Sequence, residues 1–133
     1  MKFLICLFGL YFLNMTLYCY SQSNVNFSTC EQYEKADKRL NITYQKILEE
    51  YKKDTVFINS LKKSQRIWIL FRDSELKMKY PENDVMYNYG SMYTMCVCSY
   101  LEELTLDRIK KLELWLLGVK NEEGCNGSIK NIM

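Results

Sequence analysis

The sequence predicts an all-α fold, an antiparallel three-helix bundle stapled by disulfides. Apolar residues recur at three- and four-residue steps over three long stretches, as they do on the buried side of a helix. Short polar segments separate the stretches, and short connections favour antiparallel neighbours. No stretch alternates with a period of two, so we expect no sheet.

Residues 1–21 are expected to lie outside the bundle as a secretory signal peptide. They begin with a positive charge, continue with a short apolar run and end with a small residue, Ser21, before a polar stretch. The run is too short to span a bilayer of about 30 Å, so we expect no membrane span. A lipoprotein anchored through Cys19 is the alternative, although Tyr18 stands where a small residue is usual. We expect one domain over residues 22–133, with a short polar C-terminal tail, in a periplasmic or secreted protein.

The charges of the expected mature chain are nearly balanced. The full sequence has 18 basic and 16 acidic residues, and removal of the signal segment takes one lysine. The two signs are interleaved, and no concentrated basic stripe is present. The sequence therefore lacks the basic patch that binds nucleic-acid phosphates, and we expect no nucleic acid among the partners.

Four cysteines remain after the signal segment: Cys30, Cys96, Cys98 and Cys125. An even number in a small exported chain favours disulfides. A bond between Cys96 and Cys98 would close a strained ring, which leaves two connectivities. Of these we favour Cys30 with Cys98 and Cys96 with Cys125. Zinc is disfavoured, because Cys-x-Cys lacks the usual two-residue spacer and the chain has no histidine.

The first helix is expected from Thr29 to about Tyr51. Thr29 suits the N-cap, and the negative charge of Glu31 in the first turn suits the helix dipole. The apolar positions of this helix are Tyr33, Ala36, Leu40, Tyr44, Ile47 and Tyr51. Residues 52–55 then form the connection.

The second helix is expected from Val56 to Lys79, and one of its sides mixes apolar and polar groups. Asp54 or Thr55 can cap its start, and Pro81 ends it because proline cannot donate the next backbone hydrogen bond. The residues that share the mixed side are Leu61, Gln65, Trp68 and Arg72. A solvent face would rarely place a tryptophan between such groups, so we expect this side to face the other helices.

The third helix is expected after Gly90, with Ser91 as its N-cap. The residues expected on its inner side are Met95, Cys98, Leu101, Leu104, Arg108, Leu112 and Trp115. Gly118 suits the left-handed position after the helix. We expect the polar tail beyond it to be held only by Cys125.

Four polar residues are expected on or near the inward sides of the three helices: Asp37, Gln65, Arg72 and Arg108. Buried charges need partners, and two arginines, a carboxylate and an amide can supply one another. We therefore interpret the four as a structural network that fixes helix register, in preference to a ligand or catalytic site.

The sequence offers no catalytic constellation. Without histidine, Ser-His-Asp and Cys-His arrangements are excluded, and disulfide-bonded cysteines could not act as nucleophiles. The paired glutamates are sequence neighbours, which do not face each other on a helix. We expect no catalytic, cofactor-binding or metal-binding residues.

The connection between the second and third helices is the best candidate for a partner contact. It runs from Tyr80 to Gly90, and its candidate contact residues are Tyr80, Met86, Tyr87 and Tyr89. Tyrosine and methionine are enriched at protein interfaces. The alternative, given equal weight, is that these tyrosines only cover the end of the bundle.

Several pieces of the chain together resemble a known family, the LprI-like lysozyme-inhibitor N-terminal domain of small exported bacterial proteins. The matching pieces, in order, are Cys30…Ala36-Asp37…Leu40-Asn41…Tyr44, Ser64-Gln65-Arg66-x-Trp68…Phe71-Arg72-Asp73, Gly90-Ser91 and Leu104-Thr105-x-x-Arg108…Leu112. The piece around Trp68 is the most specific. The sequence departs from the family pattern at Leu76, where a cysteine commonly follows the Arg-Asp element.

The resemblance implies a binding protein of the bacterial envelope or exterior. Its partner would be a protein, and the family name points to inhibition of a lysozyme-type muramidase. The alternative is an envelope interaction module that inhibits no lysozyme.

Overall fold

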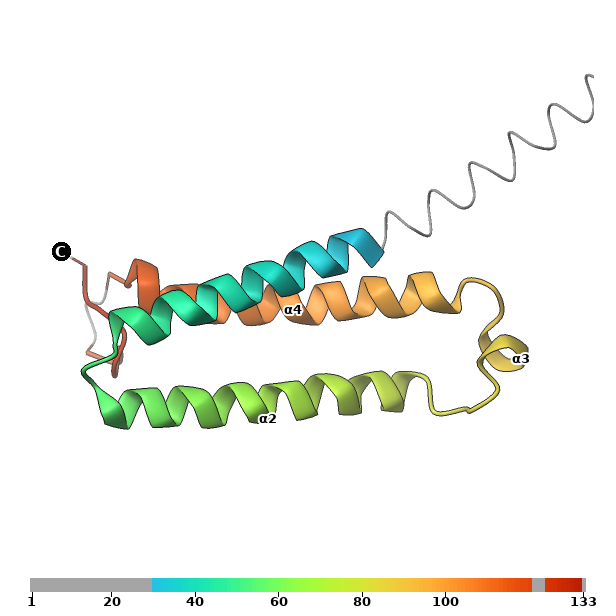
Figure 1. The fold of residues 1–133 in the computed structure, drawn as a ribbon, viewed down its shortest axis with the longest axis horizontal. Coiled ribbons are helices and arrows are strands. Elements are labelled where there is room, and N and C mark those ends of the chain that lie inside the picture. The colour runs from blue at the N-terminus through green and yellow to red at the C-terminus, as the bar shows by residue number, and fades with distance from the viewer. Residues whose placement is uncertain (1–29, 121–123, 133) are drawn as a thin grey trace, which may run out of the picture.

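The computed structural model describes residues 30–120 and 124–132. Apart from one isolated bridge, the regular secondary structure of these residues is helical. Three long helices lie side by side and successive ones run in opposite directions (Figure 1). The N-terminal helix is helical through residues 30–50, α2 spans Thr55–Lys79, and α4 spans Tyr93–Leu117. A short helix, α3 (Val85–Tyr89), lies within the segment that connects α2 to α4. The all-α class is confirmed for these residues, whereas the expected signal segment and the cap at Thr29 lie outside them.

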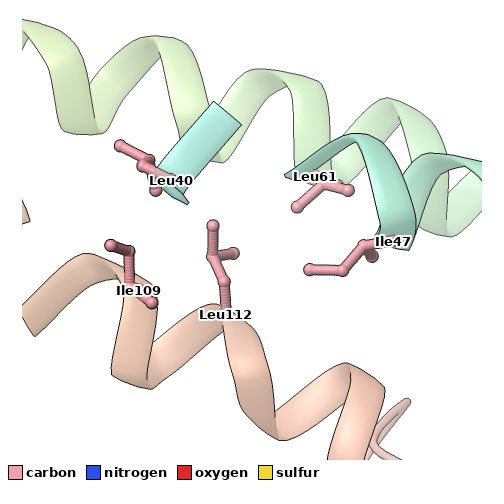
Figure 2. Packing of buried hydrophobic residues seen from close by; sticks show 5 residues of the cluster. All are labelled: Leu40, Ile47, Leu61, Ile109 and Leu112. Atoms are coloured by element: carbon pink, nitrogen blue, oxygen red, sulfur yellow. The ribbon is translucent and has the colours of Figure 1, made fainter. Parts of the chain in front are cut away.

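The hydrophobic core is formed where the three long helices meet. Its buried side chains are Leu40 and Ile47 from the N-terminal helix, Leu61 from α2, and Ile109 and Leu112 from α4. Figure 2 shows these five side chains pointing toward one another from the three helices. Burial of each such side chain contributes about 1.5–3 kcal/mol, so this cluster is the main apolar contribution to stability.

The inner side of α4 differs from the expected one. Thr105 and Ile109 are fully buried together with Leu112, although neither Thr105 nor Ile109 is on the predicted inner side. The predicted Leu104 and Arg108 are only half-buried. Two adjacent lines of residues along α4 both have helical spacing, one with Leu104 and Arg108 and one with Thr105 and Ile109. The second line, which has the small Thr105 side chain, is the one buried against the core.

Local capping fixes most helix ends. The side chain of Asp54 accepts a hydrogen bond from the Phe57 amide at 2.9 Å, so the expected cap of α2 is present. Helix α4 instead starts after Met92 without a side-chain cap, so the expected N-cap at Ser91 is wrong. The segment expected to be a loop contains α3, because the side chain of Asp84 caps its first turn.

One of the two expected disulfides is present. Cys30 is bonded to Cys98 and joins the N-terminal helix to α4 across 68 residues of chain. Cys96 carries a free, exposed thiol, so the expected bond between Cys96 and Cys125 is wrong. Cys96 lies in the first turn of α4, whereas Cys125 follows the other end of this 25-residue helix, and the helix from Cys96 to Leu117 alone spans roughly 31 Å. No disulfide can join cysteines at that separation.

The C-terminal tail folds back on the end of α4 through hydrogen bonds. The Val119 amide donates to the Lys130 carbonyl at 2.9 Å, within an isolated parallel bridge. The indole N–H of Trp115 donates to the Ser128 hydroxyl at 3.0 Å. The expectation that Cys125 alone holds the tail is therefore wrong.

Gly118 makes the reversal between α4 and the tail possible. Its φ is 77°, as expected of the residue after the helix. A Cβ atom at this position would lie 2.9 Å from the Lys130 carbonyl oxygen, so both the backbone angle and the close contact require glycine.

Candidate functional site

The four polar residues expected to form one network lie in two groups, and Trp68 joins them. In the first group, Arg108 on α4 reaches across to α2. Its Nε donates to Gln65 Oε1 at 3.0 Å and its Nη2 donates to Ser64 Oγ at 3.0 Å. Burial lowers the pKa of Arg108 from its ordinary value, yet a guanidinium stays charged throughout the physiological range.

The second group is centred on Arg72. Its guanidinium donates to Asp73 Oδ1 at 2.8 and 3.0 Å, and its Nη1 lies 4.0 Å from Asp37 Oδ1 on the N-terminal helix. The contact with Asp37 is at the outer limit of an ion pair, and Asp37 also accepts a hydrogen bond from Asn41. Gln65 therefore pairs with Arg108 and has no hydrogen bond to Arg72.

The ring of Trp68 is the common element of the two groups, and we call the ring with its partners the Trp68 cluster: Asp37, Ser64, Gln65, Trp68, Arg72, Asp73 and Arg108. The guanidinium carbon of Arg72 lies 5.5 Å from the ring centre, and that of Arg108 lies 5.9 Å from it. Both distances are within the range of cation–π attraction. Each cation thus already has protein partners, and the arrangement ties α2 to both neighbouring helices.

The end of the molecule that carries α3 is covered by an aromatic cluster. The Tyr80 ring meets the rings of Tyr89 and Tyr93 edge-on, with centres 5.2 and 5.3 Å apart, and Tyr89 stacks on Tyr93 at 5.7 Å. The Tyr89 hydroxyl also accepts a hydrogen bond from the Glu82 amide at 3.0 Å. Tyr80 and Tyr89, two of the four candidate contact residues, therefore cover the bundle end, together with Tyr93, which was not among the candidates.

The other two candidate contact residues project into solvent. Met86 is 67% exposed and Tyr87 is 87% exposed, and Met92, just before α4, is 50% exposed. We call Met86, Tyr87 and Met92 the α3 surface. Methionine and tyrosine are enriched at protein interfaces, and here they are exposed on a segment that is held at both ends.

Two contacts of Tyr100 join α4 to α2 beside this end, and nothing in the sequence indicated them; we call them the Tyr100 latch. The Tyr100 hydroxyl donates to Glu75 Oε2 at 2.9 Å, and the Lys79 ammonium lies 3.7 Å from the Tyr100 ring centre. The hydrogen bond to Glu75 raises the pKa of Tyr100, with desolvation second, because ionisation would remove the donated proton.

A family model described as "Lysozyme inhibitor LprI" matches residues 19–112. The chain belongs to the LprI lysozyme inhibitor family. No curated protein and no solved structure matches it significantly. The match includes α2 and α3 and ends within α4, so it contains both the Trp68 cluster and the α3 surface.

This LprI-family chain makes its disulfide to α4, whereas Leu76 occupies the position on α2 where a cysteine was expected from the resemblance. Helix α2 is therefore not covalently tied to its neighbours by any described cysteine. Among the described residues there is no group of side chains that could hold a metal ion, and no helix there has the length and apolarity needed to cross a membrane.

Proposed function

We propose that the protein is an exported inhibitor of a lysozyme-type muramidase, and that the α3 surface is the part that contacts the enzyme. Membership of the LprI lysozyme inhibitor family is the observation that carries this proposal. Processing of residues 1–21 as a signal peptide and release into the periplasm or exterior belong to the same proposal, as does the absence of catalytic activity.

The position of the α3 surface supports its assignment as the contact. The surface stands at one tip of an elongated molecule (Figure 1), and a projecting tip can enter a concave active site. Met86 and Tyr87 belong to the residue types that are enriched at protein interfaces.

Preorganisation also favours this end. The cap at Asp84 and the tyrosine cluster hold α3 between the ends of two long helices. A held segment loses little conformational entropy on binding, which raises affinity for a given contact area. The only charges between residues 80 and 92 are the carboxylates of Glu82 and Asp84, so this tip is negative and favours a basic partner surface.

Inhibition of cell-wall lysis tests the proposal. The protein is titrated against several lysozyme types in a turbidity assay, and we expect dose-dependent inhibition of at least one of them. Tyr87→Ala and Met86→Ala should each raise the concentration for half-inhibition about tenfold, as loss of an interface anchor does.

Met78→Ala is the matched control. Met78 is 69% exposed, about as much as Met86 at 67%, but it lies on α2 and outside the α3 surface. Its inhibition curve should equal that of the unchanged protein. An absence of inhibition at excess protein against every lysozyme type would refute the inhibitor assignment, and unaltered inhibition by both α3 variants would refute the contact surface.

A further inference from the structure

Helix α2 turns apolar side chains outward as well as inward. Leu70 is 68% exposed and Met78 is 69% exposed, although both belong to a helix whose other side faces the core. The exposed residues on this outer side are Val56, Ile67, Leu70, Phe71 and Met78, which we call the α2 stripe. Their spacing places them on one face of the helix, roughly opposite Leu61 and Gln65.

The α2 stripe is long and has no cover among the described residues. Its main part, from Ile67 to Met78, extends over roughly 17 Å at 1.5 Å per residue, and Val56 stands apart, because Ser60 and Lys63 occupy this face between Val56 and Ile67. In Figure 1 the N-terminal helix and α4 lie on one side of α2, and no other element lies on its far side. Exposed apolar surface of this extent on a small protein usually marks a binding site.

The apolar surface continues from the stripe toward α4. A groove of about 660 Å³ separates the two helices, and Phe71 belongs to both the groove and the stripe. The other apolar residues that line the groove are Trp68, Leu104 and Leu114. Asp107, Arg108, Lys110 and Lys111 stand along its α4 side, and Lys110 pairs with Asp107 at 3.0 Å.

Basic residues border this surface on both long edges. Lys63, Arg66 and Lys77 follow the edge of the stripe that is farther from the groove, and Lys111 stands on the opposite edge. Among the described residues, Lys63, Lys77 and Lys111 make no ion pair.

The charge balance of α2 is positive and little of it is neutralised. The helix contains six basic residues and two acidic ones. Asp73 already accepts from Arg72, and Glu75 accepts from Tyr100. The surface thus combines an apolar centre with free positive charge at its edges, which is the composition of helices that lie in the headgroup region of membranes.

We propose that the α2 stripe docks the protein on an anionic lipid surface, with Leu70, Phe71 and Met78 among the acyl chains and the bordering cations among the headgroups. The stripe is a convex ridge, and a flat lipid surface can contact it along its full length. A second copy fits less well, because antiparallel pairing centred on Leu70 would place Lys77 opposite Lys63 of the other copy, where like charges repel. This surface is separate from the α3 surface and goes beyond the proposed inhibition.

Vesicle binding tests the proposal. The protein is purified from an exporting host, its N-terminus is determined by mass spectrometry, and it is mixed with phosphatidylglycerol vesicles or phosphatidylcholine vesicles before flotation. We expect binding to phosphatidylglycerol, weak binding to phosphatidylcholine, and a loss of binding as salt screens the cations.

Two sets of variants locate the contact. Lys63→Gln, Arg66→Gln and Lys77→Gln should each lower the partition coefficient about fivefold, the usual effect of one basic residue at an anionic surface. Leu70→Ser combined with Phe71→Ser should reduce it at least tenfold through lost apolar insertion. Thermal unfolding by circular dichroism checks that each variant is folded.

Controls with the same change in charge, or with one exposed apolar residue made polar, come from elsewhere in the chain. Lys38→Gln, Lys46→Gln and Lys53→Gln alter exposed lysines outside α2, and Ile42→Ser alters an exposed residue of the N-terminal helix. These controls should bind as the unchanged protein does. Equal binding to both lipids, or equal losses in the α2 variants and the controls, would overturn the proposal. An absence of vesicle binding at low salt, including one accompanied by dimerisation or by capture of an acidic peptide, would also overturn it. Lysozyme inhibition is measured without lipid, so either proposal can fail alone.

Discussion

The N-terminal helix and α4 are held together differently from α2. The N-terminal helix and α4 bury Leu40, Ile47, Ile109 and Leu112 between them and are joined by the Cys30–Cys98 disulfide. Helix α2 is as long as α4 but buries only Leu61. Its attachment is largely polar and aromatic, through the Trp68 cluster and the Tyr100 latch.

The two attachments show that strength and position are set by different interactions in this fold. Apolar burial is non-directional, and the disulfide lowers the entropy of the unfolded chain, so both act mainly on how strongly the N-terminal helix and α4 are held together. Hydrogen bonds to guanidinium and carboxylate groups require particular positions, so they fix where α2 sits more than how strongly it is held.

Removal of the disulfide should produce the largest change. Cys30→Ala combined with Cys98→Ala frees a chain segment of 68 residues, and the entropy gained by the unfolded state corresponds to about 4 kcal/mol. Urea unfolding measures the loss. Cys96→Ser changes the free thiol and should leave the midpoint unaltered. A loss under about 1 kcal/mol in the double variant would mean that apolar burial alone holds the first pair.

Disruption of the Arg108 contacts should have an intermediate effect. Arg108→Met leaves Gln65 without its partner on α4 and should cost about 2 kcal/mol, as hydrogen bonds to charged groups do. The double variant with Gln65→Met should cost less than the sum of the single changes, because the two residues interact directly. Lys110→Met is the control on the same helix, since its exposed ion pair with Asp107 contributes little. Strict additivity of the Arg108 and Gln65 changes would show that the Trp68 cluster does not hold α2 through this hydrogen bond.

The Tyr100 latch should give the smallest effect, and that effect should depend on pH. Folding raises the Tyr100 pKa above 10.0, so the unfolded state ionises first as pH rises. The contribution of the hydrogen bond to Glu75 is therefore complete below about pH 10 and is lost as pH passes the folded pKa. Urea midpoints measured from about pH 8 to about pH 11 should show the unchanged protein and Tyr100→Phe converging at the alkaline end. A difference that stayed constant over this range would contradict the latch.

Features fixed by local sequence were predicted well. The cap at Asp54 and the end of α2 before Pro81 follow from the chemistry of single residues. The mixed side of α2 was placed inward correctly, because Trp68 and Leu61 left few other arrangements.

Features that depend on packing between distant segments were predicted poorly. Helical spacing alone could not choose between the row with Arg108 and the row with Thr105 and Ile109 on α4. In the α3 segment, composition identified the four candidate contact residues but could not tell the covering Tyr80 and Tyr89 from the exposed Met86 and Tyr87. That distinction depends on Tyr93, which lies on another helix.

The orientation of the long helices has a practical consequence for any attachment to the protein. Residue 30 lies at the end of the molecule that carries α3, whereas the folded tail lies at the opposite end, past Gly118 (Figure 1). A label or support joined beyond the tail would be spaced from Tyr87 by about the length of α4, roughly 37 Å. The start of the N-terminal helix lies toward the end of the molecule that carries α3, so the tail is the attachment point farther from the α3 surface (Figure 1).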